Sequence, residues 1–148
     1  MFPQLYYELS GGTHDAANKT FTTLDSSATT SDAYYLQAYG VGGVVNCSRG
    51  SGEDATLAKN FLSGLSFKQI GSVSNNGVAD TRVLATSVGG PDVSYAPLGV
   101  SGLNPFRYVY PGVNNPGGYD LWVQLVISGK TNLICNWSRQ VQVNSPLP

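Results

Sequence analysis

The stretch that decides the expected fold is NPFRYVYPGVNNPGGYDLWVQLVISGKTNLICNW, which runs from Asn104 to Trp137. Aromatic and β-branched residues at Phe106–Tyr110 predict a strand, and the Pro, Gly and Asn residues that follow predict a loop. The apolar run Tyr119–Ile127 predicts a longer strand, which turns back at Gly129 into Thr131–Trp137. Residues 104–137 are therefore expected to form a C-terminal sheet of three consecutive antiparallel strands.

Helices are expected upstream of this sheet. Ser51–Ser63 has the strongest helical pattern, because its apolar residues recur on one face and its first Ser and Asp suit a capping box. Asp32–Tyr39 predicts a shorter helix capped by Ser31, although a strand fits those residues nearly as well. Residues 1–12 predict the end of another helix, which stops at two consecutive glycines.

The rest of the chain is predicted to consist of loops and short strands. Thr13–Thr30 is poor in large apolar residues and predicts a long loop, whereas Arg82–Val88 predicts a strand and Gly89–Gly102 a loop. Gln140–Val143 alternates polar and apolar residues as an edge strand does. The structural core is expected to include Tyr108, Trp122 and Trp137 from the C-terminal sheet, and Phe61 and Leu62 from the predicted helix.

Length and composition indicate the class of protein. The chain has 148 residues, enough for a single domain with a buried core. Its 18 Gly, 8 Pro and only 11% charged residues indicate many loops and strands. The net charge of −1 argues against nucleic acid and against an anionic membrane surface as partners. No apolar run is as long as a transmembrane helix, so these residues alone predict a soluble domain.

The sequence contains few residues in the patterns that are typical of catalytic or metal-binding sites. His14 is the one histidine, so a typical zinc set has no second member, and no Ser lies in the elbow motif of hydrolases. We therefore expect no catalytic residue, no metal ligand and no cofactor, and we predict that the chain is not an enzyme. Cys47 and Cys135 lie too far apart in the sequence for a redox motif. They are either two buried thiols or one disulfide.

Three motifs of the decisive stretch carry a family resemblance. Tyr108–Gly112 (YVYPG), Asn115–Trp122 (NPGGYDLW) and Asn136–Trp137 (NW) follow one another in this order. Together they resemble the C-terminal signature of major pseudopilins, the pilin-like subunits of type II secretion systems. The likeness is to the divergent prepilin-type proteins of the Verrucomicrobia and Planctomycetes. Asp54–Leu65 (DATLAKNFLSGL) and Leu5–Leu9 (LYYEL) extend the resemblance over most of the chain.

The resemblance implies a pilin-like α+β fold for a single domain of residues 1–148. The residue patterns by themselves predict the same α+β class, with a truncated N-terminal helix, residues 1–12, and a short helix packed on an antiparallel sheet of about four strands. The implied function is that of a structural subunit of a secretion pseudopilus or type IV pilus-like filament. Its partners would be other copies of itself, minor pilin-like subunits and an inner-membrane assembly platform. Membrane contact would run only through a hydrophobic helix that is missing upstream, so Met1 is expected to be an engineered start.

The resemblance also bears on location, cysteines and calcium. It implies an inner-membrane anchor and a domain in the periplasm or outside the cell, where a Cys47–Cys135 disulfide can persist. Many major pseudopilins hold calcium in the loop after the equivalent of Tyr119-Asp120. In this chain Asp120 is the last carboxylate residue, and calcium takes about six to eight oxygens, normally with several carboxylates. We therefore predict that the chain has no calcium site.

A secreted or surface binding module, either an adhesin or a carbohydrate-binding domain, is the alternative function. The nine tyrosines would then present their aromatic faces on the surface of a sheet. If the chain is not a binding module, their rings are expected to pack inward with the hydroxyl groups exposed to water. The upstream sequence separates the two functions. A prepilin leader followed by about 20 apolar residues indicates a pilin-like protein, whereas a conventional signal peptide indicates a secreted binding module.

Overall fold

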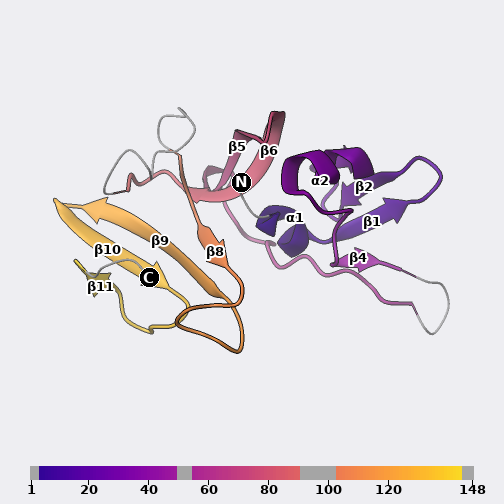
Figure 1. Ribbon diagram of the computed structural model, residues 1–148. Coiled ribbons are helices and arrows are strands. Elements are labelled where there is room, and N and C mark those ends of the chain that lie inside the picture. Colours follow the sequence, from indigo (N-terminus) through magenta and orange to yellow (C-terminus); the bar gives the residue numbers. More distant parts are fainter. Residues whose placement is uncertain (1–3, 50–54, 91–102, 145–148) are drawn as a thin grey trace. The chain divides into compact units, whose positions relative to one another are not determined.

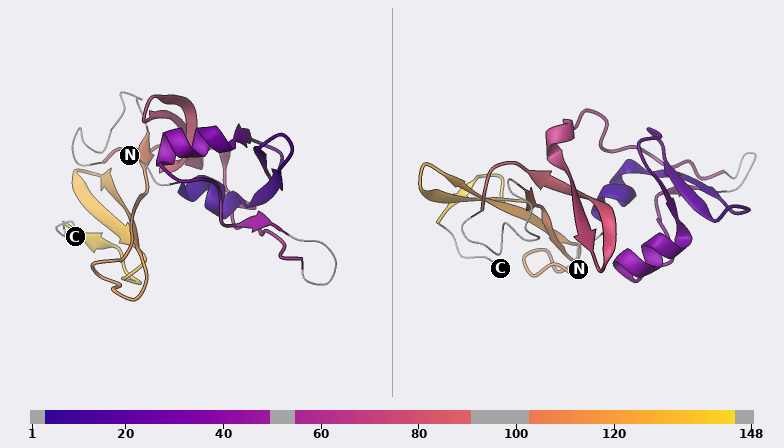
Figure 2. Two further views of the ribbon diagram at one scale, coloured as in Figure 1. Left: turned by 45° about the vertical axis from the view of Figure 1, so that its right-hand side comes forward. Right: turned by 90° about the horizontal axis from the view of Figure 1, so that it is seen from above.

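The computed structural model describes residues 4–49, 55–90 and 103–144. Over these residues the fold is mixed α/β and mostly strand, with 41% strand and 13% helix. Figures 1 and 2 show the helices and strands from three sides. The single domain expected from the length divides into two compact units. Unit 1 comprises Met1–Ser66 and Ser72–Val83, and unit 2 comprises Phe67–Gly71 and Leu84–Pro148. The described residues form three sheets where the sequence predicted one.

The first sheet lies in unit 1 and has the strand order β3-β2-β1-β4; Figure 1 labels its strands β1, β2 and β4. The long loop predicted for Thr13–Thr30 is wrong, because three of these strands fall in or overlap that range. Its threonines are β-branched and suit a pleated surface, and Phe21 anchors the sheet with only 2% of its surface exposed. The strands are β1 (Gly12–Asp15), β2 (Thr20–Thr23), β3 (Thr29–Ser31) and β4 (Cys47–Ser48), with β4 parallel to β1 and the other pairs antiparallel.

Two α-helices occur in the described part of the chain, α1 (Leu5–Ser10) and α2 (Asp32–Tyr39), both in unit 1. Helix α2 begins where the sequence predicts, because the Ser31 hydroxyl accepts a hydrogen bond from the Tyr34 backbone nitrogen at 3.2 Å. Helix α1 ends at Gly11, whose φ of 60° favours glycine. Neither helix is long and apolar enough to cross a membrane.

Aromatic rings build the core of unit 1. Tyr6 and Tyr7 of α1, Tyr35 and Tyr39 of α2, and Phe21 of β2 are all buried. Most neighbouring rings meet edge to face, as Tyr7 and Tyr35 do with centroids 5.4 Å apart. Burial raises the pKa of the Tyr7, Tyr35 and Tyr39 hydroxyls well above the ordinary tyrosine value. These phenols therefore stay neutral at physiological pH and contribute to packing.

The helix predicted for Ser51–Ser63 is also wrong over its described residues, since residues 55–63 contain no helix; residues 51–54 lie outside the described residues. Backbone donors in this segment bond to distant partners instead of to a helical ladder. The Phe61 nitrogen donates to the Leu9 carbonyl oxygen at 2.8 Å. The Lys59 nitrogen donates to Asn46 Oδ1 at 3.0 Å.

The apolar side chains of this segment consequently do not form the expected core. An extended segment turns successive side chains in different directions, whereas a helix would have gathered them on one face. Phe61 is 64% exposed and Leu57 74% exposed, while Leu62 is half-buried. The expectation that Phe61 lies in the core is therefore corrected.

The second sheet has the order β5-β6-β7. A short 3-10 turn, Phe67–Gln69, leads into β5 (Ile70–Asn75), which Asn76-Gly77 joins to β6 (Val78–Thr86). Both turn residues have positive φ, at 52° and 79°, as a tight hairpin requires. Strand β7 (Asn104–Pro105) pairs with the end of β6. The strand predicted from Arg82 is confirmed as far as Thr86, and the loop predicted to follow falls mostly on residues 91–102, outside the described residues.

The C-terminal sheet, in unit 2, confirms the three antiparallel strands expected from the decisive stretch (Figure 1). The turn between β9 and β10 lies at Ser128 and Gly129, with φ of 51° and 73°. The predicted edge strand near the C-terminus is confirmed in a shorter form. In the order β11-β10-β9-β8, the strands are β11 (Gln142–Val143), β10 (Lys130–Cys135), β9 (Asp120–Ile127) and β8 (Arg107–Val109).

The aromatic residues expected in the core of this sheet are only partly buried. Tyr108 is 36% exposed, because it lies on the edge strand β8 and stacks on the exposed Tyr119 with ring centroids 5.5 Å apart. Trp122 and Trp137 are half-buried and meet edge to face at 6.0 Å. The fully buried apolar side chains of the sheet are instead Val123 and Leu133, at 2% and 1% exposure.

Candidate functional site

A buried carboxylate organises the loop that precedes β9. Asp120 has 0% exposure. Its Oδ2 accepts hydrogen bonds from the backbone nitrogen and Nδ2 of Asn114, at 2.8 and 3.0 Å. Its Oδ1 accepts from the backbone nitrogen and Nδ2 of Asn115, at 3.0 and 3.1 Å. Four N–H donors thus surround one carboxylate, and we call these three residues the carboxylate lock.

The lock keeps Asp120 ionised despite its burial. Burial by itself raises the pKa of the Asp120 carboxyl, but the hydrogen bonds from Asn114 and Asn115 together lower it below the ordinary value. Gly112 allows this close packing, because a Cβ at that position would lie 2.6 Å from Asp120 Oδ1. The carboxylate therefore acts as a charged anchor that folds the loop around itself.

Asn136, which follows β10, connects the end of that strand to the loop of the carboxylate lock and to the start of β9. Its Oδ1 accepts a hydrogen bond from the Leu121 nitrogen at 3.0 Å, and its Nδ2 donates to the Tyr119 carbonyl oxygen at 2.9 Å. Its backbone nitrogen also donates to the Leu121 carbonyl oxygen at 3.1 Å. The Asn136 amide thereby extends the β9–β10 pairing past the end of β10.

The outer surface of the lock forms an open hollow of about 500 Å³. None of its lining residues carries a charge. The Tyr119 side chain is 46% exposed, and in the described residues its hydroxyl has no hydrogen-bond partner. The lining residues are Asn114, Asn115, Pro116, Gly117, Gly118, Tyr119 and Asn136.

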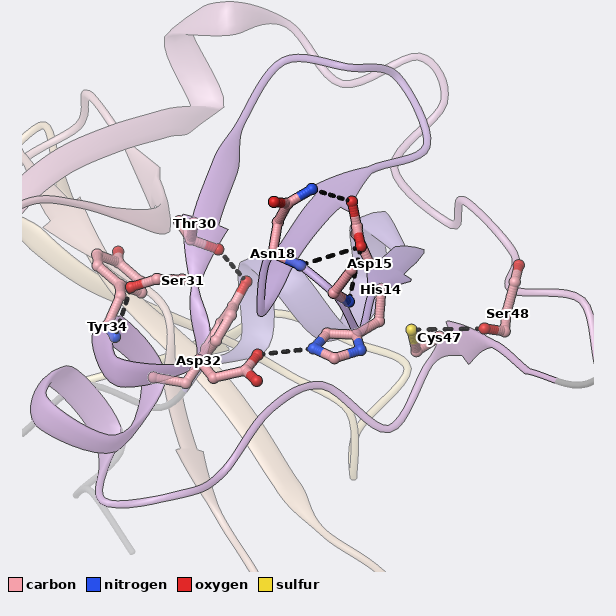
Figure 3. A network of polar contacts seen from close by, with 11 residues as sticks. His14, Asp15, Asn18, Thr30, Ser31, Asp32, Tyr34, Cys47 and Ser48 are labelled. Atoms are coloured by element: carbon pink, nitrogen blue, oxygen red, sulfur yellow. Dashed lines mark hydrogen bonds and ion pairs between the residues drawn. The ribbon is translucent and has the colours of Figure 1, made fainter.

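A second hollow, in unit 1, contains the histidine. His14 Nε2 lies 2.8 Å from Asp32 Oδ1, and this contact joins β1 to the start of α2 (Figure 3). A histidine oriented by a carboxylate could act as a base toward a nearby nucleophile. The pocket has a volume of about 520 Å³ and is lined by His14, Phe21, Asp32, Gly42, Gly43, Val44, Cys47, Ser48 and Arg49.

Cys47 is the nucleophile type in this pocket, but its environment favours the neutral thiol. Burial raises the pKa of Cys47, and this effect outweighs the charge of Arg49 and the backbone N–H of His14, which act to lower it. The side chain is 5% exposed, and its Sγ lies 3.8 Å from the Ser48 carbonyl oxygen (Figure 3). Only the thiolate is strongly nucleophilic, so the pocket holds a protonated, structural cysteine at neutral pH.

Both cysteines are free thiols in this structure. Cys47 belongs to unit 1 and Cys135, which is half-buried, to unit 2. The disulfide implied by the family resemblance therefore stays a prediction.

No three His, Cys, Asp or Glu side chains within residues 4–49, 55–90 and 103–144 are grouped so that they could hold a metal ion. In the loop where calcium was considered, both oxygens of Asp120 face N–H donors. Such donors repel a cation, whereas a calcium site needs converging oxygens. The geometry of the lock is thus that of a carboxylate satisfied by amides.

Sequence reasoning identified the motif residues around the lock but missed what they do together. Asn115, Asp120 and Asn136 were quoted only as parts of motifs, and Asn114 only as part of a loop. The sequence did contain a signal for such a loop, because two asparagines precede two glycines and an aspartate. Asparagine and aspartate side chains readily form hydrogen bonds with nearby backbone groups. The pairing of His14 with Asp32 gave no such signal, because it joins residues from separate elements.

No protein-family model, curated protein or solved structure matches the chain.

Proposed function

We propose that the chain is a pilin-like structural subunit, which assembles with copies of itself and with minor pilin-like subunits into a secretion pseudopilus or type IV pilus-like filament. In this proposal the domain lies in the periplasm or outside the cell. An inner-membrane platform directs assembly, and a hydrophobic N-terminal helix anchors the subunit.

The observation that carries the proposal is the convergence of the motif residues. Asn115 and Asp120 come from the second motif of the resemblance and Asn136 from the third, and all three take part in the lock or its tie to β10. Tyr108 of the first motif stacks on Tyr119 of the second. The motif residues thus contact and position one another. This supports a structural role for them, as expected of a subunit whose function is to assemble into a filament.

The chemistry of the described residues supports the same proposal. The His14–Asp32 pair faces a thiol that burial keeps protonated, so its pocket offers no activated nucleophile. The carboxylate of Asp120 is fully occupied by amide donors and is closed to solvent. These groups fit a protein whose polar side chains stabilise loops.

The proposal is tested by fractionation of cells that produce the natural protein. Filaments are sheared from the cell envelope, sedimented and probed with an antibody against this chain. We expect the chain in the filament fraction. In such filament systems a separate cytoplasmic ATPase supplies the energy for assembly, and we expect deletion of that ATPase to move the chain to the membrane fraction. Recovery of the chain only as free protein, with or without the ATPase, would contradict the proposal.

A further inference from the structure

We propose that the hollow over the carboxylate lock is a binding site for a neutral glycan, with one pyranose ring stacked on Tyr119. This inference goes beyond the structural role proposed above, since a filament subunit can bind a ligand without needing it for assembly. It rests on the free hydrogen-bonding atoms, the exposed ring and the absence of charge in the hollow.

The lock fixes the orientation of two amide groups. A carboxylate can only accept hydrogen bonds, so Asp120 draws the Nδ2 atoms of Asn114 and Asn115 toward itself. The Oδ1 atoms of both asparagines accept no hydrogen bond in the described residues. Two rigidly held acceptors are therefore left for donors from outside, and their order before binding lowers the entropic cost of recognition.

An aromatic face lies beside these acceptors. Tyr119 is 46% exposed and is supported from one side by Tyr108, with ring planes at 29°. Gly117 and Gly118 line the same hollow, and a Cβ on either would meet nothing within 4 Å. A flat ring can therefore approach Tyr119 without obstruction from the loop.

The lack of charge selects the ligand class. No lining residue is ionised, and the nearby Asp120 carboxylate is buried under four N–H donors. A cation would lack a carboxylate partner, and an anion would lack an Arg or Lys. A sugar ring supplies hydroxyl donors for the Oδ1 atoms and an apolar C–H face for the tyrosine.

The test is titration of the isotope-labelled, purified 148-residue chain, followed by backbone amide NMR. The probes are millimolar cellohexaose, maltohexaose and chitohexaose, with glycerol as a source of hydroxyls without a ring and calcium chloride as a cation. We expect at least one hexaose to shift the amide signals of Gly117, Gly118 and Tyr119, while glycerol and calcium leave them unchanged.

Three variants locate the binding on Tyr119. Tyr119→Ala is expected to weaken glycan binding about tenfold or more, which corresponds to about 1.4 kcal/mol, whereas Tyr119→Phe keeps the ring and most of the affinity. Ile127→Ala, an equally exposed position at 49% on the far end of β9, serves as the matched control and should bind normally. Because folding is read from the same spectra, loss of structure is distinguished from loss of binding.

The proposal is overturned if no hexaose shifts these signals, if glycerol shifts them equally, or if calcium alone does so. It is also overturned if Tyr119→Ala binds as tightly as the unaltered chain. Assembly into filaments is not measured in this experiment, so failure of glycan binding leaves the structural role unaffected, and failure of the structural role leaves the glycan result unaffected.

Discussion

The side-chain oxygen of Asn136 lies 3.0 Å from the backbone nitrogen of Leu121, and so a residue just beyond β10 satisfies a backbone donor of β9. With its amide nitrogen on the Tyr119 carbonyl oxygen, this side chain holds the loop and both strands in one arrangement. The relationship explains why an asparagine follows β10, and it makes the stability of unit 2 sensitive to a single amide.

Asn136→Ala should destabilise the chain by about 1–3 kcal/mol, because the Leu121 N–H loses its partner. Urea unfolding followed by tryptophan fluorescence measures this loss, since Trp122 and Trp137 flank the site. Asn132→Ala, in the neighbouring strand β10, is the matched control, because within the described residues the Asn132 side-chain amide donates only to the Lys130 carbonyl oxygen two residues away, at the surface. Equal effects of the two substitutions would show that the Asn136 tie has no special role.

The carboxylate lock should make stability depend on acid pH. The folded-state pKa of Asp120 lies below its ordinary value, so its contribution is fully present above the ordinary carboxyl pKa of about 4. The contribution is lost as the pH falls from there through the folded-state pKa. Asp15 and Asp25, whose pKa values are also lowered, act in the same direction.

Asp120→Asn therefore should lower the melting temperature at neutral pH and flatten its fall in acid. The new amide cannot accept four hydrogen bonds, and it has no charge to lose on acidification. Thermal melts from neutral pH down to about pH 2 compare the two slopes. A variant that melts lower but keeps the full acid dependence would place the titrating group elsewhere.

Ser31→Ala should cost about 1 kcal/mol, because the hydroxyl of Ser31 caps α2 through the Tyr34 nitrogen. Chemical unfolding with far-UV circular dichroism detects the change. Ser63→Ala provides the comparison, since Ser63 is exposed and lies outside the described helices and strands. A Ser31 variant as stable as the Ser63 variant would exclude an energetic role for the cap.

Calcium should leave the melting temperature unchanged. A ligand at about a hundred times its dissociation constant adds about 2.7 kcal/mol, which a melt would detect easily. Asp120 offers no free oxygen for the ion, because Asn114 and Asn115 donate to both. Melts in millimolar calcium and in chelator make the comparison. A rise of several degrees that Asp120→Ala abolishes would refute this expectation.

Sequence reasoning worked best where local chemistry decides the structure. The Gly129 turn, the strands beside it and the Ser31 cap all depend on neighbouring residues, and all were predicted. It failed at Ser51–Ser63, where the helical pattern was overridden in residues 55–63 by distant partners such as Leu9 and Asn46. The lock was missed for a different reason: the β9–β10 hairpin itself was predicted, but a hydrophobic pattern does not show which side chain bonds which backbone group, such as Asn136 to the Leu121 nitrogen.

The most direct test of the structural role is mass spectrometry of the N-terminus of the mature natural protein, recovered from the cell envelope. The proposed pilin-like subunit predicts cleavage of a short leader immediately before a phenylalanine, followed by about 20 apolar residues. Cleavage after small residues at the end of a conventional signal peptide, with no apolar helix retained, would contradict it and favour a secreted binding module.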